Sequence, residues 1–124
     1  MIGSGVRALE YATTFANLGS RVSILNEYEQ FLPFLDHEIS EQLQKVLDKH
    51  KIEVFSDAEN IEIKQNTLRN TTEVKYNLRT DKGKGRDFVI ETEHVLYLGG
   101  KVPNTQNIGL DKAGVEVDDE GYIK

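Results

Sequence analysis

A glycine-rich turn close to the start of the chain is the stretch best suited to hold a ligand. Residues 3–10 read Gly-Ser-Gly-Val-Arg-Ala-Leu-Glu, with small residues at positions 3, 5 and 8. Gly3 permits a tight turn out of a strand, Gly5 leaves room for a pyrophosphate to approach the backbone, and Ala8 allows close helix–sheet packing. A phosphate would face the positive end of the following helix. The pattern predicts a dinucleotide site, and the alternative is a strand-to-helix turn without a ligand.

The residues that would contact the adenosine ribose should follow about 20 positions later, usually as an acidic side chain at the end of the next strand. Asn26 and Glu27 occupy this place, directly after an apolar run. Residues 26–30 include no Arg or Lys that could receive a 2′-phosphate. We therefore expect NAD rather than NADP, with NADP as the alternative, and Glu27 has a second interpretation as a solvated loop charge.

Other chemistries have little support in the sequence. The chain contains no cysteine, which excludes disulfides, thiolate metal sites and a Cys-x-x-Cys redox pair within it. The histidines His37, His50 and His94 are isolated, and each is expected to be a surface or helix-end residue. No catalytic residue and no metal ligand is therefore predicted.

The elements that must position the turn alternate between helix and strand. We expect a helix over 6–18 that ends at Gly19, and a second helix with Asp36 as its N-cap. Short β-type runs lie at 21–25 and 52–55. This alternation predicts a parallel sheet covered by helices, with ligands at the carboxyl ends of the strands.

The pattern changes in the second half of the chain. Segments 61–63 and 73–78 alternate apolar and polar residues, which is typical of antiparallel strands with one wet face. A turn is expected over 81–86 and a returning strand at 88–90, and a last apolar strand over 94–98 ends at a Gly-Gly pair. The predicted fold class is α/β, a Rossmann-like βαβαβ parallel sheet with an antiparallel β-meander and a truncated first strand.

The truncated first strand has a physical consequence. Only Met1 and Ile2 precede the first glycine, although this strand should be central in the parallel sheet. Its absence would leave backbone groups of both neighbours unpaired. We therefore expect the chain to fold marginally or to pair with a second copy as a homo-oligomer.

Length and charge limit the classes of partner. The chain has 124 residues, enough for one domain, and a formal net charge of −6. This charge argues against nucleic acid or an anionic membrane surface as the main partner. No apolar run approaches membrane-spanning length and no signal peptide is recognisable, so the cytoplasm is the default expectation.

Three segments together resemble one family of enzymes. Residues 3–10, the segment Phe31-Leu32-Pro33-Phe34-Leu35-Asp36-His37-Glu38-Ile39, and the run from Gly100-Lys101-Val102-Pro103-Asn104-Thr105 to 109–115 are similar in order and spacing to the pyridine nucleotide-disulfide oxidoreductases. This family includes dihydrolipoamide dehydrogenase, glutathione reductase and mercuric reductase. The resemblance covers essentially the whole chain.

The resemblance implies that residues 1–124 are a single NAD(P)-binding domain, part of a larger FAD-containing enzyme. NADH would deliver hydride to a flavin held by a domain absent here, and the remaining FAD and interface domains would be the protein partners. The FAD is not expected to bind this chain. The parent would be an NAD(P)H-dependent flavoenzyme, whereas the isolated chain is not expected to be active.

Individual site residues follow from the same resemblance. Glu10 matches a Glu near the nicotinamide, with an exposed first-turn acid as the alternative interpretation. Asn26 aligns with the family's ribose acid, and Lys101 stands in place of a signature Arg. Arg7 could reach the pyrophosphate or be a surface charge. The predicted cofactor-binding set is Gly3, Gly5, Val6, Arg7, Ala8, Glu10, Asn26, Glu27, Gly99, Gly100 and Lys101.

Two other functions compete with this one. The chain could be a non-catalytic Rossmann-like interaction module that has lost dinucleotide binding, an alternative favoured by Asn26, Arg7 and the short first strand. A free-standing NAD-dependent dehydrogenase is the weakest alternative, because no Ser/His/Asp constellation is apparent.

Overall fold

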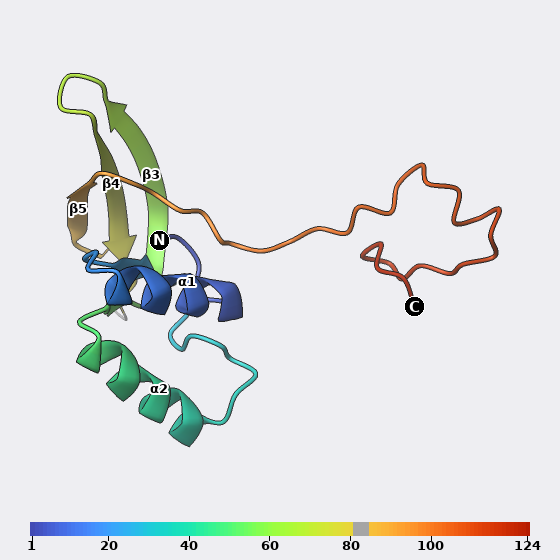
Figure 1. Cartoon of the computed structure of the whole chain (residues 1–124), viewed down its shortest axis with the longest axis horizontal. Coiled ribbons are helices and arrows are strands. Elements are labelled where there is room, and N and C mark those ends of the chain that lie inside the picture. Colours follow the sequence, from blue (N-terminus) through green and yellow to red (C-terminus); the bar gives the residue numbers. More distant parts are fainter. Residues whose placement is uncertain (81–84) are drawn as a thin grey trace.

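The computed structural model describes residues 1–80 and 85–124, so most of the turn predicted over 81–86 lies outside the described residues. Two helices and five strands are present within the described ranges, in the order predicted (Figure 1). The elements are α1 (Val6–Asn17), β1 (Ser23–Leu25), α2 (His37–Lys49), β2 (Glu53–Phe55), β3 (Ala58–Asn66), β4 (Thr71–Leu78) and β5 (Asp87–Thr92).

The parallel sheet is assembled from segments far apart in the sequence. Strands β1 and β2 pair in parallel, and Ile2 forms parallel bridges to Leu25 of β1 and to Tyr97. The amide of Leu25 donates to the carbonyl of Met1 at 2.8 Å, and the amide of Leu98 donates to the carbonyl of Ile2 at 2.7 Å. The first strand is therefore central, as predicted: Ile2 is paired on both sides, and Met1 pairs with β1.

The strand predicted over 94–98 is reduced to one bridge at Tyr97. Its partner segment, Met1 and Ile2, is only two residues long, so a longer ladder cannot form on that side. The prediction of a full strand was wrong for this reason, although the segment lies where the strand was expected.

The antiparallel meander has strand order β3-β4-β5, as predicted. Figure 1 shows it on one side of the molecule, with both helices on the other side. The parallel sheet lies between two cores, because alternate residues of β1 point to opposite faces. Ile24 belongs to the core under the helices and Leu25 to the core under the meander. We call these the helix-side core and the meander-side core.

The helix-side core is built from apolar residues of α1, α2 and the segments around them, and the meander-side core from the parallel sheet, β3 and β4. The buried members of the helix-side core are Leu9, Ala12, Val22, Ile24, Phe31, Leu32, Leu47 and Ile52. Those of the meander-side core are Ile2, Leu25, Ala58, Val74 and Tyr76.

The C-terminal ends of both helices follow the same local pattern. Gly19, with φ of 93°, ends α1, and the amide of Ser20 donates to the carbonyl of Phe15, as in a Schellman motif. The same motif ends α2, with Lys51 at φ 57° in the left-handed position. Asp36 stands at the N-cap of α2 as predicted, but its side chain makes no capping hydrogen bond.

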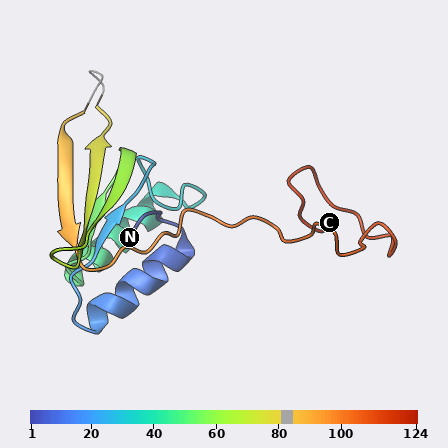
Figure 2. The ribbon, with the colours of Figure 1, turned by 90° about the horizontal axis from the view of Figure 1, so that it is seen from above.

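Residues 99–124 run away from the packed body in both ribbon views (Figure 1, Figure 2). This segment has a local fold of its own, in which Val117 and Ile123 pair and the Asp118 carboxylate accepts hydrogen bonds from the amides of Glu120 and Tyr122. In the part of the chain that the structure describes, neither helix has the length and apolar character needed to cross a bilayer.

Candidate functional site

The first glycine of the turn is required by backbone packing. Gly3 has φ of 101°, a conformation that L side chains rarely adopt, and its amide donates to the carbonyl of Leu25 at 3.0 Å. A Cβ placed on Gly3 would lie 2.6 Å from the Leu98 carbonyl oxygen. The pairing that holds the central strand therefore presses the turn against the backbone of Leu98 and Gly99.

The second glycine has a different surrounding. Gly5 occupies the N-cap of α1 with extended backbone angles, and a Cβ placed on it would meet nothing within 4 Å. The N-terminus of α1 thus opens onto free space, where the partial positive charge of the helix is available to an anion. Ala8 is fully buried, which fits the close packing expected of the third small position.

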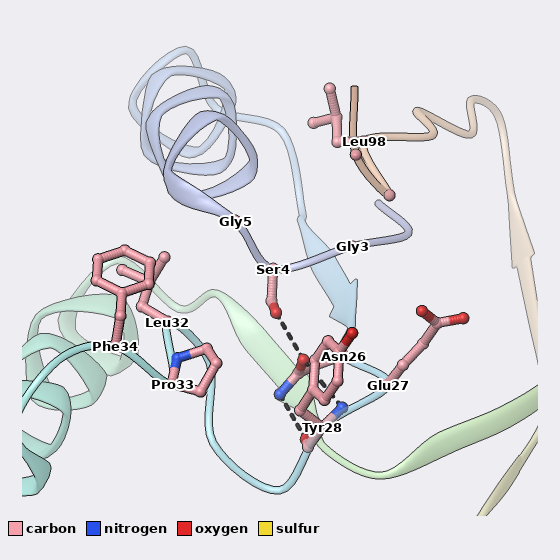
Figure 3. Close-up of a pocket in the computed structure, with 12 residues that line it drawn as sticks. Gly3, Ser4, Gly5, Asn26, Glu27, Tyr28, Leu32, Pro33, Phe34 and Leu98 are labelled. Atoms are coloured by element: carbon pink, nitrogen blue, oxygen red, sulfur yellow. Dashed lines mark hydrogen bonds between the residues drawn. The ribbon is translucent and has the colours of Figure 1, made fainter. Parts of the chain in front are cut away.

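Asn26 ties this turn to the loop that follows β1. The Ser4 hydroxyl donates to Asn26 Oδ1 at 2.6 Å, Asn26 Nδ2 donates to the Tyr28 carbonyl at 2.6 Å, and the Tyr28 amide donates back to Oδ1 at 3.2 Å (Figure 3). Asn26 has no exposed surface. Both polar ends of its amide are therefore engaged within the protein.

Glu27, the other ribose candidate, is exposed and lies beside Asn26 at the edge of the cleft. Figure 3 draws its carboxylate away from the Asn26 network. The two candidates thus differ in what they can do: the amide of Asn26 supports the turn from within, and the carboxylate of Glu27 is accessible to a ligand.

A cleft of about 200 Å³ brings the glycine-rich turn, the end of β1 and the Gly99–Gly100 pair together. Its lining residues are Gly3, Ser4, Gly5, Asn26, Glu27, Tyr28, Leu32, Pro33, Phe34, Leu98, Gly99 and Gly100. Six of the predicted site residues meet here. The carboxyl end of β1 lies at this cleft, in agreement with the expectation for a parallel sheet.

The other predicted site residues lie outside the cleft. Val6, Arg7 and Glu10 are exposed on α1, and Arg7 and Glu10 line a separate hollow of about 310 Å³ with Tyr11 and Thr14. Glu10 belongs to the second turn of α1, whose first turn holds no acid, so its interpretation as a first-turn acid was wrong. Lys101 is exposed on the departing segment.

Sequence reasoning missed several residues of the cleft. Ser4, Pro33 and Phe34 line it, as does Leu32, which has φ of 51°. Their signal was limited to their position, next to a motif residue or in the loop after β1. The pair Tyr97 and Lys101 was also passed over, although it has the Tyr-x-x-x-Lys spacing of some dehydrogenases. The structure shows no helix there that would place the two side chains on one face.

None of the described groups with a shifted pKa is a lining residue of the cleft. Burial lowers the pKa of the Met1 ammonium, and burial together with the Glu53 carboxylate raises the pKa of Tyr76. A hydrogen bond to Glu59 raises the pKa of Arg79. Within the described ranges no cluster of His, Asp and Glu could hold a metal ion. The cleft itself offers the Glu27 carboxylate, the Tyr28 side chain, the Ser4–Asn26 network, backbone groups and apolar residues.

Comparison with known proteins gives this arrangement a context. The family described as pyridine nucleotide-disulphide oxidoreductase matches residues 1–124. A dihydrolipoyl dehydrogenase of Cupriavidus necator is 36% identical over 124 residues, which are 100% of this chain and 25% of the relative. A mercuric reductase of Staphylococcus aureus is 29% identical over 123 residues, covering 99% of this chain and 21% of the relative.

Solved structures agree with these relatives. A copper(II) complex of a mutant flavoprotein disulfide reductase, RclA of Escherichia coli, superposes with a TM-score of 0.76 at 25% identity and covers 99% of this chain and 25% of that one. LpdA of Mycobacterium tuberculosis gives a TM-score of 0.73 at 26% identity, with 98% and 24% covered. The chain therefore spans about a quarter of the length of the proteins it matches.

Proposed function

The chain belongs to the pyridine nucleotide-disulphide oxidoreductase family, and from this membership we propose that residues 1–124 form the pyridine-dinucleotide-binding domain of a flavin-dependent disulfide oxidoreductase. The bound dinucleotide would supply a hydride to a flavin held by another domain. The supporting observation is the cleft that joins the α1 N-terminus, the end of β1 and the Gly99–Gly100 pair.

The residues present fit a dinucleotide. An added Cβ on Gly5 would meet no atom within 4 Å, which leaves open space for a pyrophosphate at the N-terminus of α1. Gly3 and the Asn26 network hold the turn in place, so the amides at the helix start are oriented before the ligand arrives. Binding and orientation of the dinucleotide are the work we assign to this chain.

We further propose that Glu27 selects NADH over NADPH. It is the one charged side chain among the lining residues of the cleft. A carboxylate accepts hydrogen bonds from the hydroxyls of a ribose and repels a 2′-phosphate. Asn26 cannot take this part without giving up its bonds to Ser4 and Tyr28.

We propose that three residues outside the cleft also contact the dinucleotide or a neighbouring domain: Arg7, Glu10 and Lys101. Arg7 and Glu10 share one exposed face of α1, where they could be approached by the nicotinamide half of the ligand or by a neighbouring domain. Lys101 follows Gly100, a lining residue, and is exposed, and its positive charge would suit a contact with the phosphates. The chain supplies no cysteine pair, so the dithiol of the parent reaction would belong to another part.

The segment 101–124 supports the existence of such other parts. Several of its apolar side chains are exposed, with 89% of Val102, 60% of Ile108 and 57% of Ile123 accessible to solvent. Exposed apolar side chains on a segment that leaves the body suit a covering partner. We propose that the FAD and interface domains of the parent supply it.

An amide NMR titration of the 124-residue chain with NADH, NADPH and FAD tests the function. We expect NADH to shift the amides of Gly3, Gly5 and Glu27 more strongly than NADPH does, and FAD to shift none of them. Glu27→Gln should bring the two dissociation constants closer together. Glu29→Gln, an exposed acid of the same loop outside the cleft lining, is the matched control and should leave their ratio unchanged.

Each outcome separates the alternatives. A dispersed spectrum that responds to none of the three ligands would reject the dinucleotide site and favour the interaction module, which would then be tested by concentration-dependent assembly. Equal binding of NADH and NADPH by the unmodified chain would retain the site and reject the selectivity assigned to Glu27.

A further inference from the structure

The cleft is lined by two exposed aromatic rings, Tyr28 and Phe34, that the proposed contacts with pyrophosphate and ribose do not use. Phe34 lines the cleft and is 71% exposed, whereas Phe31, three residues earlier in the same loop, is buried at 5%. In Figure 3 the ring of Phe34 lies beside Pro33 and Leu32, with Asn26 and Glu27 on the other side of the cleft. The loop thus places one phenylalanine in the core and offers the next one to a ligand.

The loop that holds Phe34 is fixed at several points. Leu32 anchors its side chain in the helix-side core at 6% exposure, and its carbonyl accepts the Leu35 amide at 2.9 Å. Gln30 Nε2 donates to the Leu35 carbonyl at 3.2 Å and to the hydroxyl of Ser40, a buried residue of α2, at 2.8 Å. The backbone on both sides of Phe34 is therefore held by packing and hydrogen bonds.

The backbone of Leu32 shows that this position is maintained against a cost. Its φ of 51° is a left-handed conformation, which a non-glycine residue adopts only where the surrounding structure enforces it. Leu32 belongs to the helix-side core and lines the cleft together with Pro33 and Phe34. Such outliers cluster at ligand sites, where they pre-organise contacts.

We propose that Phe34 is the stacking platform for the adenine base of the dinucleotide. This inference rests on the proposed function and adds a subsite to it. A pyrophosphate at Gly5 and a ribose at Glu27 bring the adenosine half to the end of β1, and the base attached to that ribose is then next to the loop after β1. Leu32 and Pro33 add apolar surface and no charge, which suits the face of a neutral aromatic base.

Separate halves of the ligand test this proposal in the full chain. Base–aromatic stacking is worth ~1–3 kcal/mol per base, which is about 5- to 150-fold in affinity. Phe34→Ala should weaken ADP-ribose and NADH by the same factor in this range and should leave nicotinamide mononucleotide unaffected. Phe34→Tyr should retain most of the affinity. Phe15→Ala removes another exposed ring, which stacks on Tyr11 of α1 away from the cleft, and should change none of the three dissociation constants.

A direct optical readout follows from the composition. The chain has no tryptophan, so Phe34→Trp introduces a single indole at the proposed platform. ADP-ribose should quench its fluorescence by stacking, and nicotinamide mononucleotide should not.

The two proposals fail in different ways. Unchanged ADP-ribose affinity in Phe34→Ala, in a chain that binds ADP-ribose, would overturn the stacking platform and leave the dinucleotide site standing. An equal loss for ADP-ribose and nicotinamide mononucleotide would also overturn it, because the ring would then act on the whole cleft through the loop. If the unmodified chain binds neither ADP-ribose nor NADH, the dinucleotide site is rejected and the platform with it.

Discussion

Replacing Asn26 by aspartate tests the network that holds the glycine-rich turn. The two side chains have nearly the same shape, so the change is chemical rather than steric. Aspartate can still accept hydrogen bonds from the Ser4 hydroxyl and the Tyr28 amide. It cannot donate to the Tyr28 carbonyl, and when ionised it would place an oxygen at the position of Nδ2, which lies 2.6 Å from that carbonyl oxygen.

The size of the effect follows from the burial of the site. Asn26 has no exposed surface, and an uncompensated buried charge costs about 3–5 kcal/mol. The carboxyl can avoid this cost by protonation, which at pH 7 requires ~4 kcal/mol for a group whose unfolded pKa is about 3.9. We therefore expect Asn26→Asp to lower the free energy of unfolding by about 3–4 kcal/mol at pH 7.

The effect should depend on pH with a defined sign. Burial and the facing carbonyl raise the folded-state pKa of the introduced carboxyl above its unfolded value, because the protonated carboxyl can donate to the Tyr28 carbonyl. The stability of the Asn26→Asp chain is therefore greatest below about pH 4, where the carboxyl is protonated in both the folded and the unfolded state. This stability is lost as the pH rises through the folded-state pKa of the carboxyl. The difference from the unmodified chain should thus shrink to ~1 kcal/mol near pH 4, about the net worth of one altered hydrogen bond.

Urea unfolding followed by circular dichroism between pH 4 and pH 7.5 measures this difference. Asn26→Ala is the control, because it removes all three hydrogen bonds, about 1 kcal/mol each, and introduces no titrating group. Its loss of stability relative to the unmodified chain should be independent of pH. An Asn26→Asp variant as stable as the unmodified chain at pH 7, or one whose deficit does not vary with pH, would refute a buried, fully engaged Asn26.

Three further predictions concern backbone conformation and the meander-side core. Gly3→Ala should lower the free energy of unfolding by ~3 kcal/mol or more and speed hydrogen exchange at the Leu98 amide. The reason is that the new Cβ would lie 2.6 Å from the Leu98 carbonyl oxygen, at a φ that is unfavourable for alanine. Gly5→Ala is the control: its Cβ would meet no atom within 4 Å, so the free energy of unfolding should fall by less than ~1 kcal/mol. Lys51→Gly should raise the free energy of unfolding by ~0.5–1 kcal/mol in urea titrations, since residue 51 is exposed and holds the left-handed position after α2. An unchanged free energy of unfolding would contradict the backbone strain assigned to Lys51. Tyr76→Phe should reduce the loss of stability above pH 10, because the raised pKa of Tyr76 in the folded state makes part of the stability disappear as the pH rises through it; identical alkaline unfolding curves for both chains would refute this.

Local patterns were sufficient to predict most of the fold. The helices follow from apolar spacing, and the glycine after α1 has the positive φ expected of it. The alternation in β3 and β4 predicted an antiparallel pair because each residue type already matches one face of the sheet. The exception over 94–98 depends on the length of a partner strand, which no local pattern contains.

The cleft was predicted less completely than the fold. Gly3 and Gly5 were predicted because a tight turn and a close pyrophosphate require residues without side chains, and the end of β1 because ligands bind at the carboxyl ends of parallel strands. The structure brings these parts together at the cleft. Asn26 turned inward because Ser4 and Tyr28 offer it three hydrogen bonds, and that competition is settled only in three dimensions. The positive φ of Leu32, which places Phe34 at the cleft, has no counterpart in residue type.

The pairing of Ile2 with Tyr97 has a consequence for the order of folding. Hairpins of the meander join neighbours in the sequence and cost little loop entropy, whereas this pairing joins positions from the two ends of the body. Gly3 meets Leu98 and Gly99 only when that long loop closes. We expect the cleft to be among the last features to form in refolding and the first to open in unfolding, so that a nascent chain acquires its binding surface only after β5 and the segment beyond it have been synthesised.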